Sequence, residues 1–383
     1  MLLKRKLCVA VVIAAIVFLM LASQGIQKKH FLPLSLALLS SRATPTNEET
    51  GEEEVIQQTE APSDVTPDPP KTPPPPPPNT PKLKAEEESL NNSKNDQSRS
   101  CGCNSCIADL EGSDWFQQRY DPKQHPVLRD KNNDFDPDAL KWWLGLQRSG
   151  NDQTMDSVMS KMFQVITPPA ADFLPLPTRC RKCAVVGNSG NLRQSGHGNL
   201  INSHDFIFRM NKAVTRGFEK DVGNQTTYHI LYPESAVDVA RGVGLVLLPF
   251  KLRDLEWLTS ALSTGEVKTT YMRVKERVEA DKDKVLVVNP VFFKYVNDRW
   301  TERHGRYPST GMLAIVFALH LCDQVSVFGY GADQQGNWHH YWEENRYAGA
   351  FRKTGVHSAD FETQVIHQLA KEGKISLHLA QNH

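Results

Sequence analysis

From residue 184 to the C-terminus, short apolar runs alternate with longer segments of helical periodicity. The apolar runs have the length of strands and predict β-structure at residues 184–186, 206–210, 229–232, 245–250, 285–288, 325–328 and 375–379. Helical patterns lie between or after several of them, at residues 253–262, 292–303, 310–321 and 360–371. Strands that alternate with helices favour an α/β fold in which helices cover both faces of a sheet.

The N-terminal end of the chain has the composition of a membrane anchor. Residues 7–22 are almost unbroken apolar sequence and follow Lys4, Arg5 and Lys6, a basic flank that tends to stay cytosolic. We interpret residues 1–6 as a cytosolic tail and 7–23 as a transmembrane signal anchor, so that the remainder is lumenal. A cleaved signal peptide is the alternative, because Ser23 and Gly25 offer small residues at plausible cleavage positions.

Residues 24–100 are rich in Pro and Glu and include the proline run 73–78. Such a composition cannot bury enough apolar surface to offset chain entropy, so we predict an extended lumenal stem. Aromatic residues become frequent after Cys101, which indicates a single folded domain at 101–383. The whole chain has 44 basic and 44 acidic side chains, and this balance disfavours nucleic acid as a partner.

The chain has seven cysteines, and Cys8 lies inside the apolar run. The other six form an even set, which in an oxidising lumen favours three disulfides. The spacing of Cys101, Cys103 and Cys106 also fits a metal knuckle, and Cys180 with Cys183 forms a C-x-x-C pair. Disulfides are the favoured interpretation.

Two loops have features of ligand-binding segments. Residues 187–191 (Gly-Asn-Ser-Gly-Asn) follow the first predicted strand but lack the G-x-G-x-x-G spacing of a dinucleotide site, so they fit a bare turn or a nucleotide site equally well. Residues 306–311 (Arg-Tyr-Pro-Ser-Thr-Gly) lead into an apolar helix. Ser309 or Thr310 would cap that helix and direct backbone amides at an anion, although a cap needs no ligand.

Two further segments contain histidine. One is Trp-His-His-Tyr-Trp at residues 338–342, and the other has His357 followed by Glu362. Histidines among aromatic residues can be metal ligands, acid/base groups or ordinary packing residues.

Taken together, the four segments resemble the sialylmotifs of the animal sialyltransferase family, both in their order along the chain and in their amino-acid sequence. Residues 180–227 are similar to the large motif and residues 304–325 to the small one. Residues 339–342 match the third motif, and His357 with Glu362 matches the very small H-x-x-x-x-E motif. The resemblance covers residues 101 to the C-terminus.

This resemblance implies a variant GT-A-like glycosyltransferase fold with a Rossmann-type core sheet. Within the family, segments such as Cys-Gly-Cys-Asn-Ser-Cys at 101–106 are most similar to type I and type II β-galactoside α-2,3-sialyltransferases. The implied reaction transfers sialic acid from CMP-sialic acid to the 3-hydroxyl of galactose in Gal-β-1,3-GalNAc of O-glycans or gangliosides, with inversion. A family member with a different acceptor and a catalytically weak sialoside-binding relative are the alternatives.

The resemblance also implies roles for individual residues. His357 matches the catalytic base and His340 the histidine at the donor phosphate. The residues that match donor-binding positions are Asn188, Asn211, Tyr271, Ser309, Thr310, Gly311, Gly331 and His340, and those that match acceptor-binding positions are Gln147 and Tyr307. The implied disulfides are Cys101–Cys106, Cys103–Cys180 and Cys183–Cys322. Asn91 and Asn224 lie in N-glycosylation sequons.

We expect no cofactor and no metal. The Asp-x-Asp pairs at 134–136 and 281–283 are poorly placed for metal-assisted chemistry, and the donor carries a single phosphate. The expected partners are glycoprotein and glycolipid acceptors, CMP-sialic acid and the Golgi membrane, while homodimerisation stays open. The expected location is the Golgi membrane as a single-pass type II protein, with a secreted form released by stem cleavage.

Overall fold

A computed structural model describes residues 100–130, 135–147, 153–169, 175–332, 337–344 and 355–379. The chain divides into two units, residues 1–78 and 79–383, and all described residues belong to the second. The predicted anchor at 7–23 and the predicted stem up to residue 99 lie outside them. Within the described part, none of the helices has both the length and the apolar character needed to span a bilayer.

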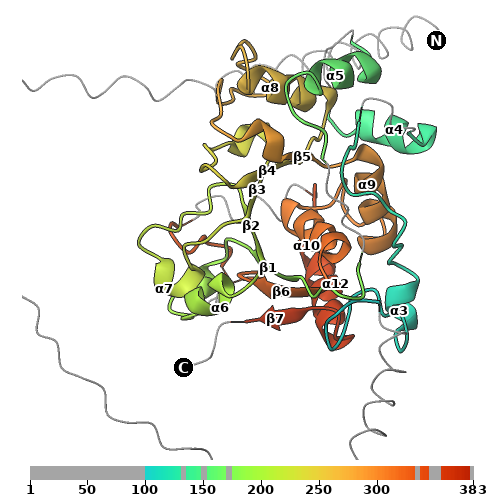
Figure 1. Cartoon of the computed structure of the whole chain (residues 1–383), viewed down its shortest axis with the longest axis vertical. Helices are drawn as coiled ribbons and strands as arrows, with labels where there is room; N and C mark the ends of the chain where they lie inside the picture. Colours follow the sequence, from blue (N-terminus) through green and yellow to red (C-terminus); the bar gives the residue numbers. More distant parts are fainter. Residues whose placement is uncertain are drawn as a thin grey trace, which may run out of the picture. The chain divides into compact units, whose positions relative to one another are not determined.

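Seven parallel strands form one sheet (Figure 1). All seven predicted strands are confirmed, with the bounds β1 (Lys182–Val186), β2 (Phe206–Met210), β3 (Tyr228–Leu231), β4 (Gly244–Leu247), β5 (Val285–Val287), β6 (Gln324–Phe328) and β7 (Ser376–His378). The strand order is β5-β4-β3-β2-β1-β6-β7. The chain therefore winds outward from β1 in one direction and returns to the other side of β1 with β6. Ligands of such sheets bind at this switch point, outside the carboxyl ends of the strands.

The two faces of the sheet carry separate cores, because neighbouring residues of a strand point to opposite faces. Cys183 and Val185 of β1 pack in the larger core with α10 (Thr310–Leu321). Ala184 and Val186 pack on the other face in a smaller core, to which α6 (Gly198–Asn202) and α7 (Glu219–Val222) contribute. Figure 1 shows α6 and α7 on one side of β1, and α10 with α12 (Ala359–Lys371) on the other. The prediction of an α/β fold with helices on both faces is confirmed.

Helix α10 is apolar all round, and every residue from Met312 to Leu321 is buried, as expected for a helix inside a large core. Ser309 is its N-cap, and the Oγ atom of Ser309 accepts a hydrogen bond of 3.1 Å from the amide of Met312. The sequence therefore fixes where this helix begins, directly beside the carboxyl ends of the strands.

The predicted helices near 253–262, 310–321 and 360–371 are α8 (Leu252–Ala261), α10 and α12. The predicted helix at 292–303 differs at both ends: α9 spans Pro290–Tyr295, a π-helical turn follows at Val296–Trp300, and the positive φ angles of Glu302 and Arg303 prevent continuation. The predicted strand 245–250 ends early, at Leu247, before Pro249, which has no amide to donate. Helices that the sequence did not predict are α3 (Asp114–Gln117), α4 (Pro137–Leu144), α5 (Met155–Met162), α6 and α7, and short 3-10 turns lie at Gly190–Leu192, Pro233–Ser235 and Lys282–Lys284.

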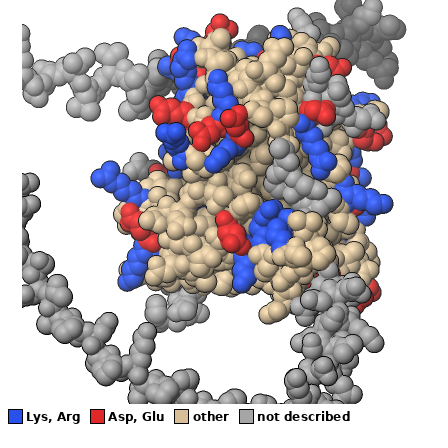
Figure 2. Space-filling model, in the orientation of Figure 1, with Lys and Arg blue, Asp and Glu red and all other residues tan. Residues whose placement is uncertain are grey.

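Three disulfides join Cys101 to Cys106, Cys103 to Cys180, and Cys183 to Cys322. These are the pairs that the family resemblance implies. Since all six sulfurs are bonded to one another, the alternative of a metal knuckle at Cys101, Cys103 and Cys106 does not hold. Figure 2 shows acidic and basic side chains interspersed on one face of the described part, so this face has charge of mixed sign.

Candidate active site

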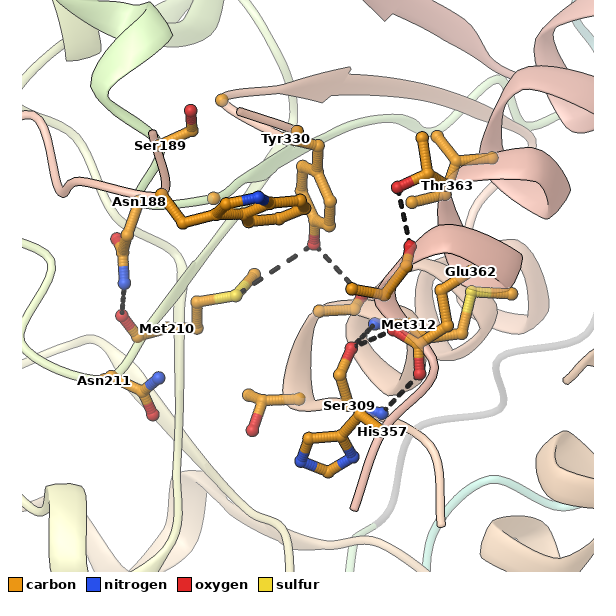
Figure 3. Close-up of a pocket in the computed structure, with 18 of the residues that line it drawn as sticks. Asn188, Ser189, Met210, Asn211, Ser309, Met312, Tyr330, His357, Glu362 and Thr363 are labelled. Atoms are coloured by element: carbon orange, nitrogen blue, oxygen red, sulfur yellow. Dashed lines mark hydrogen bonds between the residues drawn. The ribbon is translucent and has the colours of Figure 1, made fainter. Parts of the chain in front are cut away.

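A pocket of about 320 Å³ lies at the carboxyl ends of β1 and β6, at the switch point of the sheet. Its walls come from the loops after β1, β2 and β6 and from the first residues of α10 and α12. Figure 3 shows Asn188 and Asn211 on one side of this pocket and Ser309, His357 and Glu362 on the other. The predicted residues that line it are Asn188, Asn211, Ser309, Thr310, Gly311, Gly331, His340 and His357.

The backbones after β1 and β6 approach each other closely at the bottom of this pocket. A Cβ atom on Gly187 would lie 2.3 Å from the carbonyl oxygen of Gly329, which is shorter than any tolerable contact. A Cβ atom on Gly311 would lie 3.0 Å from the ring of Tyr330, whose hydroxyl donates to the Gly311 carbonyl at 3.1 Å. Any side chain at Gly187 would therefore push the loops after β1 and β6 apart, and any side chain at Gly311 would push α10 away from Tyr330.

Asn188 and Asn211 both line the pocket with their amide side chains. The Nδ2 atom of Asn188 donates to the carbonyl oxygen of Met210 at 3.0 Å, and this bond fixes the orientation of the amide. The Oδ1 atoms of Asn188 and Asn211 are both buried and have no hydrogen-bond partner in the described part of the chain. Because an unsatisfied buried carbonyl is costly, these two oxygens are suited to accept hydrogen bonds from ligand N–H or O–H groups.

The N-terminus of α10 supplies the group suited to an anion. Thr310 and Gly311 occupy its first two helical positions, where backbone amides have no partner within the helix. The Glu362 carboxylate holds the cap, since it accepts from the Ser309 amide at 2.8 Å and from the Ser309 hydroxyl at 2.5 Å. Burial raises the pKa of Glu362 to about 7, although its hydrogen bonds to Ser309 lower it. The amide and the hydroxyl of Ser309 are thus both engaged within the protein.

His357 lines the pocket, and the protein backbone holds one of its ring nitrogens. Its Nδ1 atom lies 2.8 Å from the carbonyl oxygen of Tyr307, and only a protonated Nδ1 can donate to a carbonyl, so the lone pair of the neutral ring is on Nε2. Burial lowers the pKa of His357 below its ordinary value, while the bond to Tyr307 raises it. The neutral imidazole, which can take a proton, is therefore the dominant form at neutral pH.

His340 is held next to the loop after β1. It forms an isolated antiparallel bridge with Ser189, and its ring stacks on Trp342 with the centroids 4.6 Å apart. The Nδ1 atom lies 3.0 Å from Oε1 of Glu343, a contact that is an ion pair when the imidazole is protonated. The Nδ1 atom of His340 therefore lies next to a carboxylate, whereas the Nδ1 atom of His357 lies next to a backbone carbonyl.

The remaining predicted residues lie beside the pocket. The Nε2 atom of Gln147 donates to the Tyr307 hydroxyl at 3.2 Å, and the Tyr307 ring packs edge-on against His357 with the centroids 5.0 Å apart. Tyr271 is 62% exposed and lies over the Lys251 ammonium instead of lining the pocket. Asn224 is exposed, and Asn91 lies outside the described residues.

The sequence did not predict Tyr232 and Tyr330, although both line the pocket. Tyr232 directly follows the last residue of β3, and Tyr330 lies two residues after the last residue of β6. Their position at the carboxyl edge of the sheet is the signal that could have identified them.

A pocket outside the carboxyl ends of a parallel sheet, at its switch point, is typical of α/β proteins that bind nucleotides. Residues 127–374 match the model of glycosyltransferase family 29 (sialyltransferase), and the chain belongs to this family. The predicted family, enzyme class and fold class are thus confirmed.

Similar proteins are α-2,3-sialyltransferases by name. The mouse CMP-N-acetylneuraminate-beta-galactosamide-alpha-2,3-sialyltransferase 2 is 53% identical over 280 residues, which cover 73% of this chain and 80% of the mouse protein. The human sialyltransferase 1 of the same name is 46% identical over 298 residues, or 78% of this chain and 88% of the human protein. A crystal structure of a mammalian sialyltransferase is 45% identical and superimposes with a TM-score of 0.69 over 74% of this chain and all of that one. A second crystal structure, with the same TM-score, contains Gal-beta-1-3GalNAc-ortho-nitrophenol.

Proposed function

We propose that this sialyltransferase moves sialic acid from CMP-sialic acid to the 3-hydroxyl of terminal galactose in Gal-β-1,3-GalNAc, with inversion. The position of His357 carries the proposal. It lines the pocket that contains the anion-binding helix N-terminus, and its ring also contacts Tyr307, the partner of Gln147. A donor in the pocket and an acceptor at Gln147 and Tyr307 would meet at this histidine. The names of the mouse and human relatives contain the same donor and linkage.

In this reaction the bond between sialic acid and the CMP phosphate breaks while the galactose 3-hydroxyl attacks the anomeric carbon. Nε2 of His357 takes the hydroxyl proton as general base. His340 and the amides of Thr310 and Gly311 stabilise the negative charge that develops on the leaving phosphate. Attack from the face opposite to CMP inverts the anomeric centre, so no covalent enzyme intermediate is formed.

The other donor contacts follow from the pocket and from the family. Asn188 and Asn211 would accept hydrogen bonds from the nucleotide through their buried Oδ1 atoms, and Gly331, with φ of 88°, would let the backbone approach it. Tyr271 lies outside the pocket lining, and its assignment to the donor rests on the family resemblance alone.

The acceptor is tested by incubating the protein with CMP-sialic acid and a panel that contains Gal-β-1,3-GalNAc, Gal-β-1,4-GlcNAc and a ganglioside ending in Gal-β-1,3-GalNAc. We expect efficient transfer to both acceptors that end in Gal-β-1,3-GalNAc and an α-2,3 linkage in the products by NMR. Preference for Gal-β-1,4-GlcNAc would support a family member with a different acceptor. Binding of sialosides without transfer would support the non-catalytic alternative.

We expect activity to survive EDTA at concentrations that remove divalent metals. The described carboxylates of these pairs are engaged within the protein: Asp136 caps α4, Asp281 accepts from the Gly242 amide at 2.7 Å, and Asp283 bonds to Thr167. The donor has one phosphate, whose charge the helix N-terminus can stabilise. Initial rates with EDTA and with EDTA plus manganese should agree, and a loss of activity that manganese restores would contradict the proposal.

We also propose a single-pass type II orientation in the Golgi membrane, with residues 1–6 cytosolic and the catalytic domain lumenal. The basic flank before residue 7 and the three disulfides support it. Protease added to intact Golgi vesicles should leave nearly the whole chain protected until detergent is added. Digestion of the catalytic domain without detergent would contradict the proposed orientation.

A further inference from the structure

Lys251 lies almost fully buried next to Gln147 and Tyr307. Its side chain is 2% exposed, and its ammonium lies 2.7 Å from Oδ1 of Asp254, 3.2 Å from Oε1 of Glu234 and 2.9 Å from Oε1 of Gln147. Glu234 and Asp254 are themselves 6% and 0% exposed in their side chains. A buried cluster of this kind is expensive to desolvate, and hydrophobic residues of similar volume would often be as stable.

The chemistry of the ammonium determines how Gln147 is oriented. An ammonium has three N–H donors and no acceptor, and here three oxygens surround it, one from each neighbour. It therefore faces the amide oxygen of Gln147 and never the amide nitrogen. The two ends of a glutamine amide have the same shape, so without this partner the amide could turn over. Lys251 fixes Nε2 on the side of Tyr307.

This orientation determines which hydrogen bonds the pair can offer. One N–H of Gln147 Nε2 donates to the Tyr307 hydroxyl, and the second N–H is available to a ligand. The Tyr307 hydroxyl accepts that bond, so it keeps its own proton to donate. Gln147 and Tyr307 thus present two donors to the oxygens of a sugar.

The cluster also includes the segment that carries Tyr271. The Tyr271 ring lies over the Lys251 ammonium at 4.8 Å, and the neighbouring Thr270 hydroxyl bonds to Glu234. Glu234 follows β3 and Asp254 lies in α8, so three separate segments hold the ammonium in place. The ammonium therefore has little freedom to leave the amide oxygen of Gln147.

We propose that Lys251 is a positioning residue for the acceptor, which acts by holding the Gln147 amide so that Gln147 and Tyr307 donate hydrogen bonds to the galactose hydroxyls. This inference rests on the proposed function, in which Gln147 and Tyr307 contact the acceptor. Glu234 and Asp254 serve to hold the ammonium in place.

Lys251→Met keeps an unbranched side chain that is one atom shorter and removes its charge. We expect the KM for Gal-β-1,3-GalNAc to rise about tenfold or more, as for the loss of a charged hydrogen bond, while the KM for CMP-sialic acid stays within about twofold. Arg253→Met is the matched control. Arg253 lies in α8, whose N-cap is Lys251, and pairs with Glu256 at the same i,i+3 spacing, but a third of its side chain is exposed. This control should leave both KM values within about twofold, and equal rises in both KM values for K251M would overturn the inference.

A double-mutant cycle separates positioning from general damage. If Lys251 acts through Gln147, adding K251M to Gln147→Ala should raise the acceptor KM by less than about twofold further. An additional tenfold rise would overturn the role of Lys251 and leave the proposed function intact. An unchanged acceptor KM in Q147A alone would instead overturn the proposed acceptor site together with this inference. Should K251M be recovered unfolded, K251M/D254N removes one buried negative charge as well, and the same cycle is measured with it.

Discussion

Replacing His357 by Ala is expected to lower kcat at least about a hundredfold while CMP affinity stays within a few-fold. A general base acts in the transition state, so its loss slows the chemical step more than it weakens donor binding. The lowered pKa of His357 adds a second readout. Protonation removes the base, so the rate falls as the pH drops through the pKa of His357, and burial places that fall below the ordinary value of 6.5.

The measurements are single-turnover rates between pH 5 and 8 and CMP binding by calorimetry. His340→Ala serves as the comparison. The loss of a group that we propose to lie at the donor phosphate should lower the turnover rate and also weaken CMP binding. If H357A keeps more than roughly a tenth of the wild-type rate where chemistry limits, the base lies elsewhere.

Removal of the Cys183–Cys322 disulfide is expected to cost the most stability. The bond closes a loop of 139 residues and joins β1 to the end of α10, the helix whose N-terminus we propose to bind the donor phosphate. In the chain-entropy model such a loop corresponds to about 5 kcal/mol in the free energy of unfolding. Urea titration of C183S/C322S, followed by tryptophan fluorescence, measures this loss.

The disulfide between Cys101 and Cys106 provides the control. It closes a loop of only 5 residues, so C101S/C106S is expected to lose about 2 kcal/mol by the same model. Equal losses for the two pairs would show that loop length does not determine the effect. Peptide mapping that found Cys183 and Cys322 as free thiols in the wild-type protein would contradict the pairing itself.

The strands could be predicted because each is a short apolar run between turn residues, and the same pattern indicated helices on both faces. The order of the strands could not, since the position of β6 beside β1 depends on packing between segments far apart in the sequence. Pro290 begins α9 two residues before the predicted start, because proline fits the first turn of a helix and adds no apolar periodicity.

The candidate site could also be predicted only in part. Motif resemblance identified Asn188, Asn211 and both histidines, which the structure brings to one pocket. The cluster around Lys251 was not found, because a lysine and two carboxylates in a sequence are normally expected on the surface. Only the folded chain shows that their charges are buried together.

The position of β1 between β2 and β6, inside a parallel sheet, has a consequence for biosynthesis. Its neighbour β6 is encoded far downstream, and Cys183 and Cys322 are 139 residues apart. At about 5 residues per second, β1 waits roughly 30 s on the growing chain before its second neighbour has been synthesised. During that time the backbone N–H and C=O groups on one edge of β1 and the thiol of Cys183 have no native partner, so we expect the nascent chain to depend on lumenal chaperones and disulfide isomerases until α10 and β6 emerge.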